Sequence, residues 1–235
     1  MKALVYTNQE TIIYRDENNP KEVQGESIVK VKATGICGSD MHAYHGKDER
    51  RKPPLILGHE VSGVIQNGQF KNKIVILNPL IPCNTCNYCK INMEHLCPKR
   101  SMVGMSKPFQ REGGLAEFVS IPDKNIFIKP INLDINESAL TEPVAVCVHA
   151  VQLGKKVLNK SLSDCRILIQ GGGAIGLLCG LIVSKKEKCK KIVMSDPNKL
   201  RLEECSKYLD AKFVDPANKE LNENEFDVIF DTVGL

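Results

Sequence analysis

The fold of the second half of the chain is decided by residues 167–176, which read ILIQGGGAIG. The first four of these residues are a short, mostly apolar run of the kind that forms a buried strand. Three glycines then follow in the spacing G-x-G-x-x-G, at Gly171, Gly173 and Gly176. Glycines at these positions allow a tight turn, a close approach of the backbone to a pyrophosphate, and close packing of the next helix. The segment therefore predicts a strand, a phosphate-binding turn and a helix in succession.

The residues after this turn continue the alternation of strand and helix. Apolar residues at helical spacing predict a helix over residues 174–186. A second helix is predicted at residues 197–209, and further strands at residues 192–195, 212–214 and 227–230. Strands separated by helices indicate a doubly wound parallel sheet of the Rossmann type. Such sheets usually have six strands, and the fourth strand ends close to Leu235, so we expect this sheet to be incomplete.

A carboxylate follows the turn at the distance that a nucleotide-binding sheet requires. Asp196 lies twenty residues after Gly176, at the end of the next predicted strand. There a carboxylate would accept both ribose hydroxyls and repel a 2′-phosphate, which favours NAD over NADP. The alternative is that Asp196 caps the helix after it, and the two roles are compatible. The nearby cations Lys199 and Arg201 weaken the preference for NAD.

The first half of the chain has a different texture. Residues 1–140 contain short β-like runs broken by Gly, Pro and Asn, which is typical of a β-rich domain with long loops. These runs include residues 27–33, 61–66, 73–77 and 115–121. A connecting helix is predicted from Glu142, because Pro143 suits a first helical turn.

Composition excludes several classes of protein. The chain has 235 residues with 26% charged and 42% hydrophobic side chains, as in globular proteins. The net charge of +4 is spread along the chain, which gives no electrostatic case for a nucleic-acid partner. No apolar run reaches the ~18 residues of a membrane span, and the N-terminus does not read as an export signal. We therefore expect a cytoplasmic protein, in which the ten cysteines stay reduced and the clustered ones bind metal.

Four of these cysteines form the strongest single motif. Cys83, Cys86, Cys89 and Cys97 have the spacing C-x2-C-x2-C-x7-C within one loop. Four thiolates can surround a tetrahedral ion and leave no position for substrate, which predicts a structural zinc. The spacing alone leaves an iron–sulfur cluster open, and unrelated buried thiols are the remaining alternative.

A second set of metal ligands is spread over the first half. Cys37 lies in the segment GICGSDMH, His59 and Glu60 lie in GHEVSG, and Glu142 precedes Pro143. One thiolate, one imidazole and up to two carboxylates suit a catalytic zinc, which keeps one position free. Taken singly, Cys37 could be a small buried residue and Glu142 could complement a helix N-terminus.

Together these segments resemble the zinc-dependent medium-chain alcohol dehydrogenase family, and in particular its branch of sorbitol (polyol) and threonine dehydrogenases. The resemblance rests on six segments in the family's order: residues 35–42, 58–63, 83–97, 113–119 (GGLAEFV), 142–146 and 171–176. It implies a GroES-like β-rich catalytic domain over residues 1–145. An incomplete Rossmann domain for NAD would follow over residues 146–235.

The resemblance also assigns roles to individual residues. It implies that Cys37, His59 and Glu142 hold the catalytic zinc, and that Glu60 either coordinates the zinc or supports it. Ser39 would begin a proton relay that His42 continues. Ile175, Asp196 and Arg201 match positions that contact the cofactor.

The activity that this resemblance implies is oxidation of a secondary alcohol or polyol to a ketone, with hydride transfer to NAD. An L-threonine or simple alcohol dehydrogenase is an alternative within enzymes. A truncated zinc-binding module without catalysis is an alternative outside them. The family further implies a homodimer or homotetramer.

Overall fold

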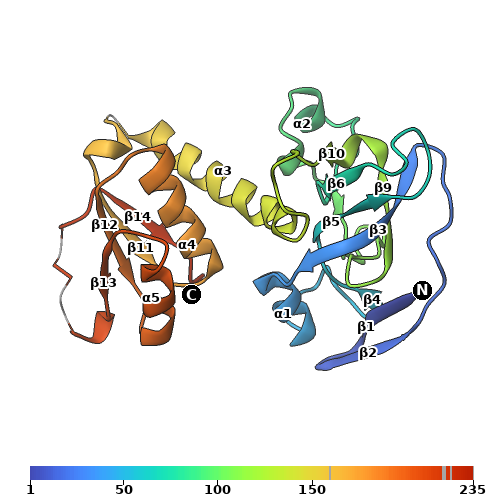
Figure 1. Ribbon diagram of the computed structural model, residues 1–235, viewed down its shortest axis with the longest axis horizontal. Coiled ribbons are helices and arrows are strands. Elements are labelled where there is room, and N and C mark those ends of the chain that lie inside the picture. Colours follow the sequence, from blue (N-terminus) through green and yellow to red (C-terminus); the bar gives the residue numbers. More distant parts are fainter. Residues whose placement is uncertain (159, 219–220, 223, 235) are drawn as a thin grey trace. The chain divides into compact units, whose positions relative to one another are not determined.

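The computed structural model describes residues 1–235 apart from residues 159, 219, 220, 223 and 235. The chain divides into two compact units, Met1–Glu142 and Pro143–Leu235, which Figure 1 colours from blue to yellow-green and from yellow to red. Each unit has its own hydrophobic core, and the two are described separately below.

The first unit is built mainly of short strands. Its strands are β1 (Lys2–Asn8), β2 (Thr11–Asp16), β3 (Glu26–Gly35), β4 (Leu55–Ile56), β5 (Glu60–Ile65), β6 (Ile74–Leu77), β7 (Leu80–Ile81), β8 (Ser101–Met102), β9 (Phe118–Pro122) and β10 (Ile126–Ile128). Its helices are α1 (Gly38–Tyr44) and α2 (Asn87–Lys90), with single 3-10 turns at Glu94–Leu96, Asp123–Asn125 and Glu137–Leu140. Helix α3 (Thr141–Val157) begins at the C-terminal end of this unit and continues into the second unit.

The strands of this unit pair antiparallel in every ladder. The largest sheet has the order β10-β6-β5-β3-β9, and a smaller sheet has the order β2-β1-β4. Strand β3 lies between β5 and β9 and is half-buried along its length, as its alternating sequence predicts. Val29, Val61, Val75 and Ile121 from four of these strands are almost fully buried and form the core. Pairing of β3 with β5 is what brings the segment after Gly35 to the start of β5.

The second unit is an alternation of strands and helices. Its elements after α3 are β11 (Arg166–Gln170), α4 (Ala174–Leu181), β12 (Lys191–Ser195), α5 (Lys199–Ser206), β13 (Lys212–Val214) and β14 (Val228–Asp231). Single turns lie at Leu162–Asp164 and Pro216–Asn218, and a π-helical turn at Ile182–Lys186 follows α4.

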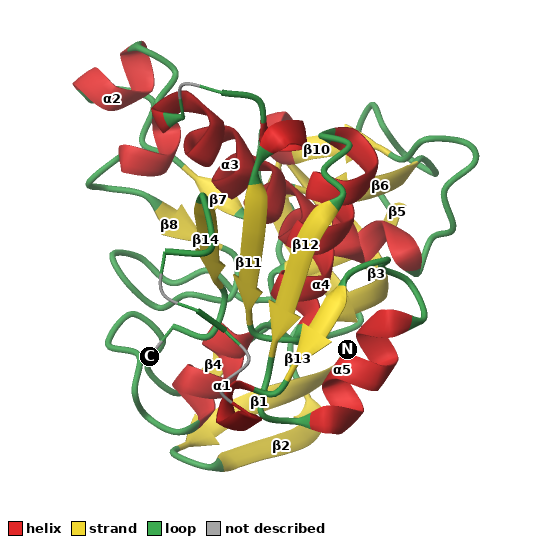
Figure 2. Cartoon of the chain, turned by 90° about the vertical axis from the view of Figure 1, so that its left-hand side faces the viewer, coloured by secondary structure: helices red, strands yellow, loops and turns green. Residues whose placement is uncertain are grey.

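The strands of this unit form one parallel sheet. Figure 2 shows them side by side in the order β13-β12-β11-β14. This is the order 3-2-1-4 that begins a doubly wound nucleotide-binding sheet. Ile167 and Ile169 of β11 are fully buried, because helices cover a central parallel strand and its apolar run cannot reach solvent. The predicted fold class, a β-rich domain followed by a partial Rossmann sheet, is confirmed.

Three element boundaries differ from the sequence prediction. The helix predicted at residues 174–186 changes to a π-helical turn after Leu181, where the Glu187 N–H donates to the Ile182 carbonyl five residues earlier. The helix predicted from residue 197 begins at Lys199, because Asn198 caps it. Strand β9 begins at Phe118, since the N–H of Leu115 instead bonds the Leu57 carbonyl.

Among the described residues, no helix combines the length and the apolar character needed to cross a membrane.

The core of the second unit predicts how the protein responds to truncation of a central side chain. We expect Ile167→Ala to lower the free energy of unfolding by about 2–5 kcal/mol, because Ile167 is fully buried and a cavity remains. Urea denaturation followed by circular dichroism measures this. Leu200→Ala is the control, since Leu200 is 74% exposed and should change stability by less than about 0.5 kcal/mol. Equal effects of the two variants would contradict the packing described here.

Candidate active site

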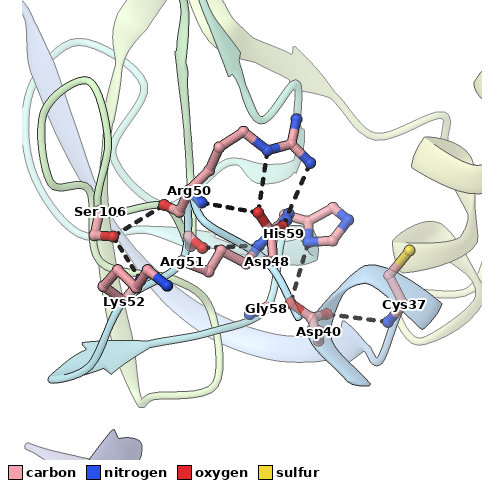
Figure 3. A network of polar contacts seen from close by, with 10 residues as sticks. Cys37, Asp40, Asp48, Arg50, Arg51, Lys52, Gly58, His59 and Ser106 are labelled. Carbon is pink, nitrogen blue, oxygen red and sulfur yellow. Dashed lines mark hydrogen bonds and ion pairs between the residues drawn. The ribbon is translucent and has the colours of Figure 1, made fainter. Parts of the chain in front are cut away.

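Cys37 is placed by the start of helix α1. It is the N-cap residue, with extended backbone angles, and Asp40 three residues later closes a capping box. The Cys37 N–H donates to Asp40 Oδ2 at 3.0 Å (Figure 3). This local bond fixes the thiol just before the first turn of α1.

The same carboxylate holds the segment that carries His59. Asp40 is 2% exposed, and its Oδ1 accepts from the Gly58 N–H at 3.3 Å. Oδ1 also lies 3.5 Å from His59 Nδ1, an ion-pair contact that is too long for a good hydrogen bond (Figure 3). Asp40 therefore joins two segments about twenty residues apart. It was missed in the sequence analysis, although its spacing from Cys37 is the signal of a capping box.

Three of the predicted ligands meet in one cluster. The ligand atoms of Cys37, His59 and Glu60 all lie within 4.8 Å of one another. His59 is 3% exposed, and its Nδ1 has no hydrogen-bond partner among the described residues. A buried polar atom without a partner is costly, and a soft thiolate, an imidazole and a carboxylate are a donor set that zinc accepts. These residues fit a metal ion.

The electrostatics of the cluster favour a thiolate. A hydrogen bond with His59 is the main cause that lowers the pKa of Cys37; burial opposes it, and hydrogen bonds from Ser39 support it. Burial disfavours the charged form of His59, but Asp40 and Cys37 outweigh it and raise the pKa of His59 to about 10. Burial raises the pKa of Glu60, and His59 opposes this.

Glu60 reaches the cluster because the opposite strand carries a glycine. Gly35 of β3 pairs directly with Glu60 of β5. A Cβ added at Gly35 would lie 1.8 Å from Glu60 Oε2, so any larger residue would force the carboxylate to move.

Glu142 lies near this cluster without being part of it. It is half-buried in the first turn of α3, and its carboxylate is not among the ligand atoms that the described residues bring within 4.8 Å. Burial raises the pKa of Glu142; the charge of His59 opposes this, and those of Glu60 and Asp40 add to it. The prediction that Glu142 is a zinc ligand stays a prediction.

The two predicted relay residues lie on α1. Ser39 is half-buried, lies two residues after Cys37 and helps to lower the pKa of its thiol. His42 is exposed in the last turn of the helix. Ser39 is therefore beside the cluster, and His42 is in contact with solvent.

The four-cysteine motif also closes into a cluster. The sulfurs of Cys83, Cys86, Cys89 and Cys97 lie within 4.8 Å of one another, and none is in a disulfide. Cys89 Sγ is 3.9 Å from that of Cys83 and 3.5 Å from that of Cys86. Four sulfurs at ~2.3 Å from one tetrahedral ion are separated by about 3.8 Å, which these distances match. An iron–sulfur cluster places several atoms between its cysteines and needs a wider spacing, so the geometry fits a single ion better.

The glycine turn lies at the end of β11 as predicted. Gly171 has a φ of +104°, and a Cβ at Gly176 would lie 1.8 Å from the Gly171 carbonyl oxygen. A Cβ at Gly173 would meet nothing within 4 Å, so its backbone is open to a ligand. The turn fits a pyrophosphate at the start of α4. Ile175 is half-buried in the first turn of this helix.

Asp196 holds this turn through a hydrogen bond to its backbone. It is 3% exposed, and its Oδ2 accepts from the Gly172 N–H at 2.8 Å while Oδ1 accepts from the Asn198 N–H at 2.7 Å. Burial opposes ionisation of Asp196, but these two bonds and Arg201 outweigh it and lower its pKa. Arg201 lies 3.6 Å from the carboxylate and is 61% exposed. The alternative role of Asp196 as a helix cap is wrong, because Asn198 accepts from Leu200 and Arg201 instead.

Thr232 is a further residue of the turn that the sequence analysis missed. Its hydroxyl lies 2.7 Å from the Gln170 carbonyl oxygen, to which it donates, and 3.3 Å from that of Gly171. It follows β14, and no local motif marks it because its partners are about sixty residues earlier.

The chain is similar to known dehydrogenases in both sequence and fold. Residues 23–131 match the model of the alcohol dehydrogenase GroES-like domain. D-xylulose reductase A of Aspergillus niger is 33% identical over 88% of this chain, and L-galactonate-5-dehydrogenase of Escherichia coli is 28% identical over 94%. The solved structure of the alcohol dehydrogenase TADH from Thermus sp. ATN1 covers the whole chain with a TM-score of 0.86 and 26% identity.

The contact between Gly35 and Glu60 leads to a test of the metal cluster. We expect Gly35→Ala to weaken zinc binding at one site by about tenfold, because the added methyl displaces the Glu60 carboxylate. Competition with a chromogenic chelator measures the affinity. In Gly38→Ala, the matched control, the new methyl has nothing within 4 Å and zinc affinity should not change. Unchanged affinity in Gly35→Ala would mean that Glu60 does not contribute to metal binding.

The chain spans less than two thirds of the length of the two relatives found by sequence. It covers 57% of the xylulose reductase, 64% of the galactonate dehydrogenase and 71% of the Thermus enzyme. The matched domain, the identity over most of the chain and the agreement in fold lead to one conclusion: the chain contains an alcohol dehydrogenase GroES-like domain and is similar over most of its length to alcohol and polyol dehydrogenases.

Proposed function

We propose that this protein oxidises a secondary alcohol or polyol to a ketone and transfers the hydride to NAD. The observation that carries the proposal is the buried cluster of Cys37, His59 and Glu60, which has the donor set of a catalytic zinc site. The open glycine turn at Gly173 supports a nicotinamide cofactor. The relatives named for D-xylulose and L-galactonate support a polyol substrate.

In this proposal residues 1–145 form the catalytic domain and residues 146–235 the cofactor domain. Cys37, His59 and Glu60 hold the catalytic zinc, and Glu142 is the remaining candidate ligand. When bound, zinc acts as a Lewis acid that lowers the pKa of the substrate hydroxyl. Asp40 holds the Cys37 and His59 segments in place through its backbone hydrogen bonds and ion pair.

The chain's own residues then handle the proton. Ser39 Oγ, half-buried close to Cys37, accepts the proton of the substrate hydroxyl as it gives up its own proton. The exposed imidazole of His42 takes up that second proton and releases it to solvent. The nicotinamide supplies the hydride acceptor, which is chemistry of the cofactor itself.

The second cluster has a structural role in the proposal. Cys83, Cys86, Cys89 and Cys97 hold one zinc that stabilises their loop. Because all four donors are thiolates, this site has no position for substrate.

Asp196 and Arg201 are proposed to bind the adenosine ribose. The carboxylate of Asp196 lies against the turn and is ionised, which favours ribose hydroxyls over a 2′-phosphate. NAD is therefore proposed ahead of NADP. A homodimer or homotetramer, a cytoplasmic location and the lack of a nucleic-acid partner stay predictions from the sequence.

Removing the thiol ligand tests the catalytic proposal. We expect Cys37→Ala to lose detectable NAD reduction with a panel of polyols, L-threonine and simple alcohols, while its affinity for NADH is unchanged. The physical reason is that a three-residue ligand set loses its softest donor, whereas the glycine turn is intact. Stopped assays and NADH fluorescence titration measure the two properties.

Two further variants interpret this result. Cys189→Ala removes a buried thiol outside both clusters and should keep full activity. Cys89→Ser should lower the zinc content by one per chain and destabilise the loop. Full activity in Cys37→Ala would refute the catalytic zinc, and a wild-type protein that binds no NADH would favour the non-catalytic zinc module.

The charge of Asp196 gives a test of cofactor preference. We expect Asp196→Asn to shift the ratio of NADPH to NADH affinity about tenfold toward NADPH, which corresponds to about 1.4 kcal/mol of relieved repulsion. Asparagine keeps an oxygen that can accept from the Gly172 N–H, so the turn should persist. Asp210→Asn, at an exposed position, is the control and should leave the ratio unchanged. A ratio equal to the wild-type value would remove Asp196 from the specificity argument.

A further inference from the structure

A cavity in the first unit connects Ser39 with a group of basic side chains. Its volume is about 640 Å³, within the range of small-molecule sites. Four of its lining residues are cationic: Arg50, Arg51, Arg100 and Lys107. No Asp or Glu of the described residues lines it.

One carboxylate behind the wall offsets part of this charge. Asp48 is 9% exposed and pairs with both Arg50 and Arg51 (Figure 3). Burial opposes ionisation of Asp48, but hydrogen bonds from these arginines outweigh it and lower its pKa to about 2, so it is charged. Four cations against one anion leave a net positive cavity.

The basic residues differ in what they can offer a ligand. Arg51 is 1% exposed, donates to the Gly104 carbonyl and to Asp48, and so fixes the wall. Arg100 uses one N–H on the Cys97 carbonyl and is otherwise exposed, and Lys107 is exposed. Arg100 and Lys107 are therefore the side chains best placed to meet an anion.

The cavity also includes a residue of the proposed reaction. Ser39 lines it and lies two residues after Cys37 of the metal cluster. Leu80, Pro98 and Met105 also line the cavity, so a ligand in it would meet apolar as well as cationic side chains. A neutral polyol would make no use of the positive charge of these cations, whereas a ligand with an anionic group would be attracted to it.

We propose that the substrate is an anionic polyol, whose reacting hydroxyl lies at Ser39 and whose carboxylate or phosphate binds Arg100 and Lys107. This inference rests on the proposed function and specifies its substrate class. Arg51 is a positioning residue that holds the wall through Asp48. The shared chemistry is a polyhydroxy chain with an anionic end, from either a sugar acid or a sugar phosphate.

A matched series of six-carbon compounds tests the proposal in the zinc-loaded protein. Sorbitol, gluconate and sorbitol 6-phosphate differ mainly in the charge of one end. We expect calorimetry to find at least tenfold tighter binding of one or both anions than of sorbitol, and binding should weaken as salt is raised. Preference for gluconate or for the phosphate distinguishes the two sources of charge.

Variants at the basic end separate charge from structure. Lys107→Ala should weaken binding of the preferred anion about tenfold and leave sorbitol binding unchanged, whereas Lys107→Arg should keep it. Lys99→Ala is the matched control, because Lys99 is exposed beside Arg100 but does not line the cavity. Equal affinity for sorbitol and for both anions would overturn the inference. So would an equal loss of anion affinity in Lys99→Ala and Lys107→Ala.

Turnover distinguishes this failure from failure of the proposed function. Oxidation of sorbitol without any preference for the anions would remove only the anionic substrate class. Anion binding that depends on Lys107 but gives no NAD or NADP reduction would refute the dehydrogenase proposal and with it the substrate assignment.

Discussion

A single buried carboxylate organises the metal cluster on which the proposed chemistry depends. Asp40 accepts the N–H groups of Cys37 and Gly58 and lies against the ring of His59. Its two oxygens thereby fix Cys37, in the connection between β3 and α1, and Gly58, just before β5. Burial makes these bonds strong, because water cannot compete for the carboxylate. They add to the β3–β5 ladder, which already brings the segments of the thiol and the imidazole together.

The sheet supplies the rest of the geometry. Pairing of β3 with β5 sets Gly35 opposite Glu60, and the missing side chain of the glycine leaves room for the carboxylate. A shift of one residue in this register would turn Glu60 to the other face of the sheet. The cluster is therefore as rigid as the ladder beneath it, which suits a site that must hold a metal ion and still leave one position open.

The glycine turn of the second unit is likewise held by side chains from distant parts of the sequence. Asp196 fixes the turn through the Gly172 N–H, and Thr232 holds the strand end below it. Both residues lie after other strands of the parallel sheet, whose carboxyl ends meet at one edge. The bond between Asp196 and the turn also orients the carboxylate before any nucleotide binds, so its proposed contact with a ribose hydroxyl would need little reorganisation.

The sequence by itself determined the features that depend on local spacing. The four-cysteine loop, the strand–turn–helix at the glycines and the alternation of strands and helices each follow from residues that are close in the chain. Tertiary structure decided which acidic residues matter: it joined Glu60 to Cys37 and His59, left Glu142 outside the 4.8 Å cluster, and revealed Asp40 and Thr232. It also brought Ser39 and the basic residues of the cavity together, although the basic residues alone are spread over nearly sixty positions of the sequence. The physical reason is that strand register and burial, which set these distances, arise from contacts between segments that no local pattern encodes.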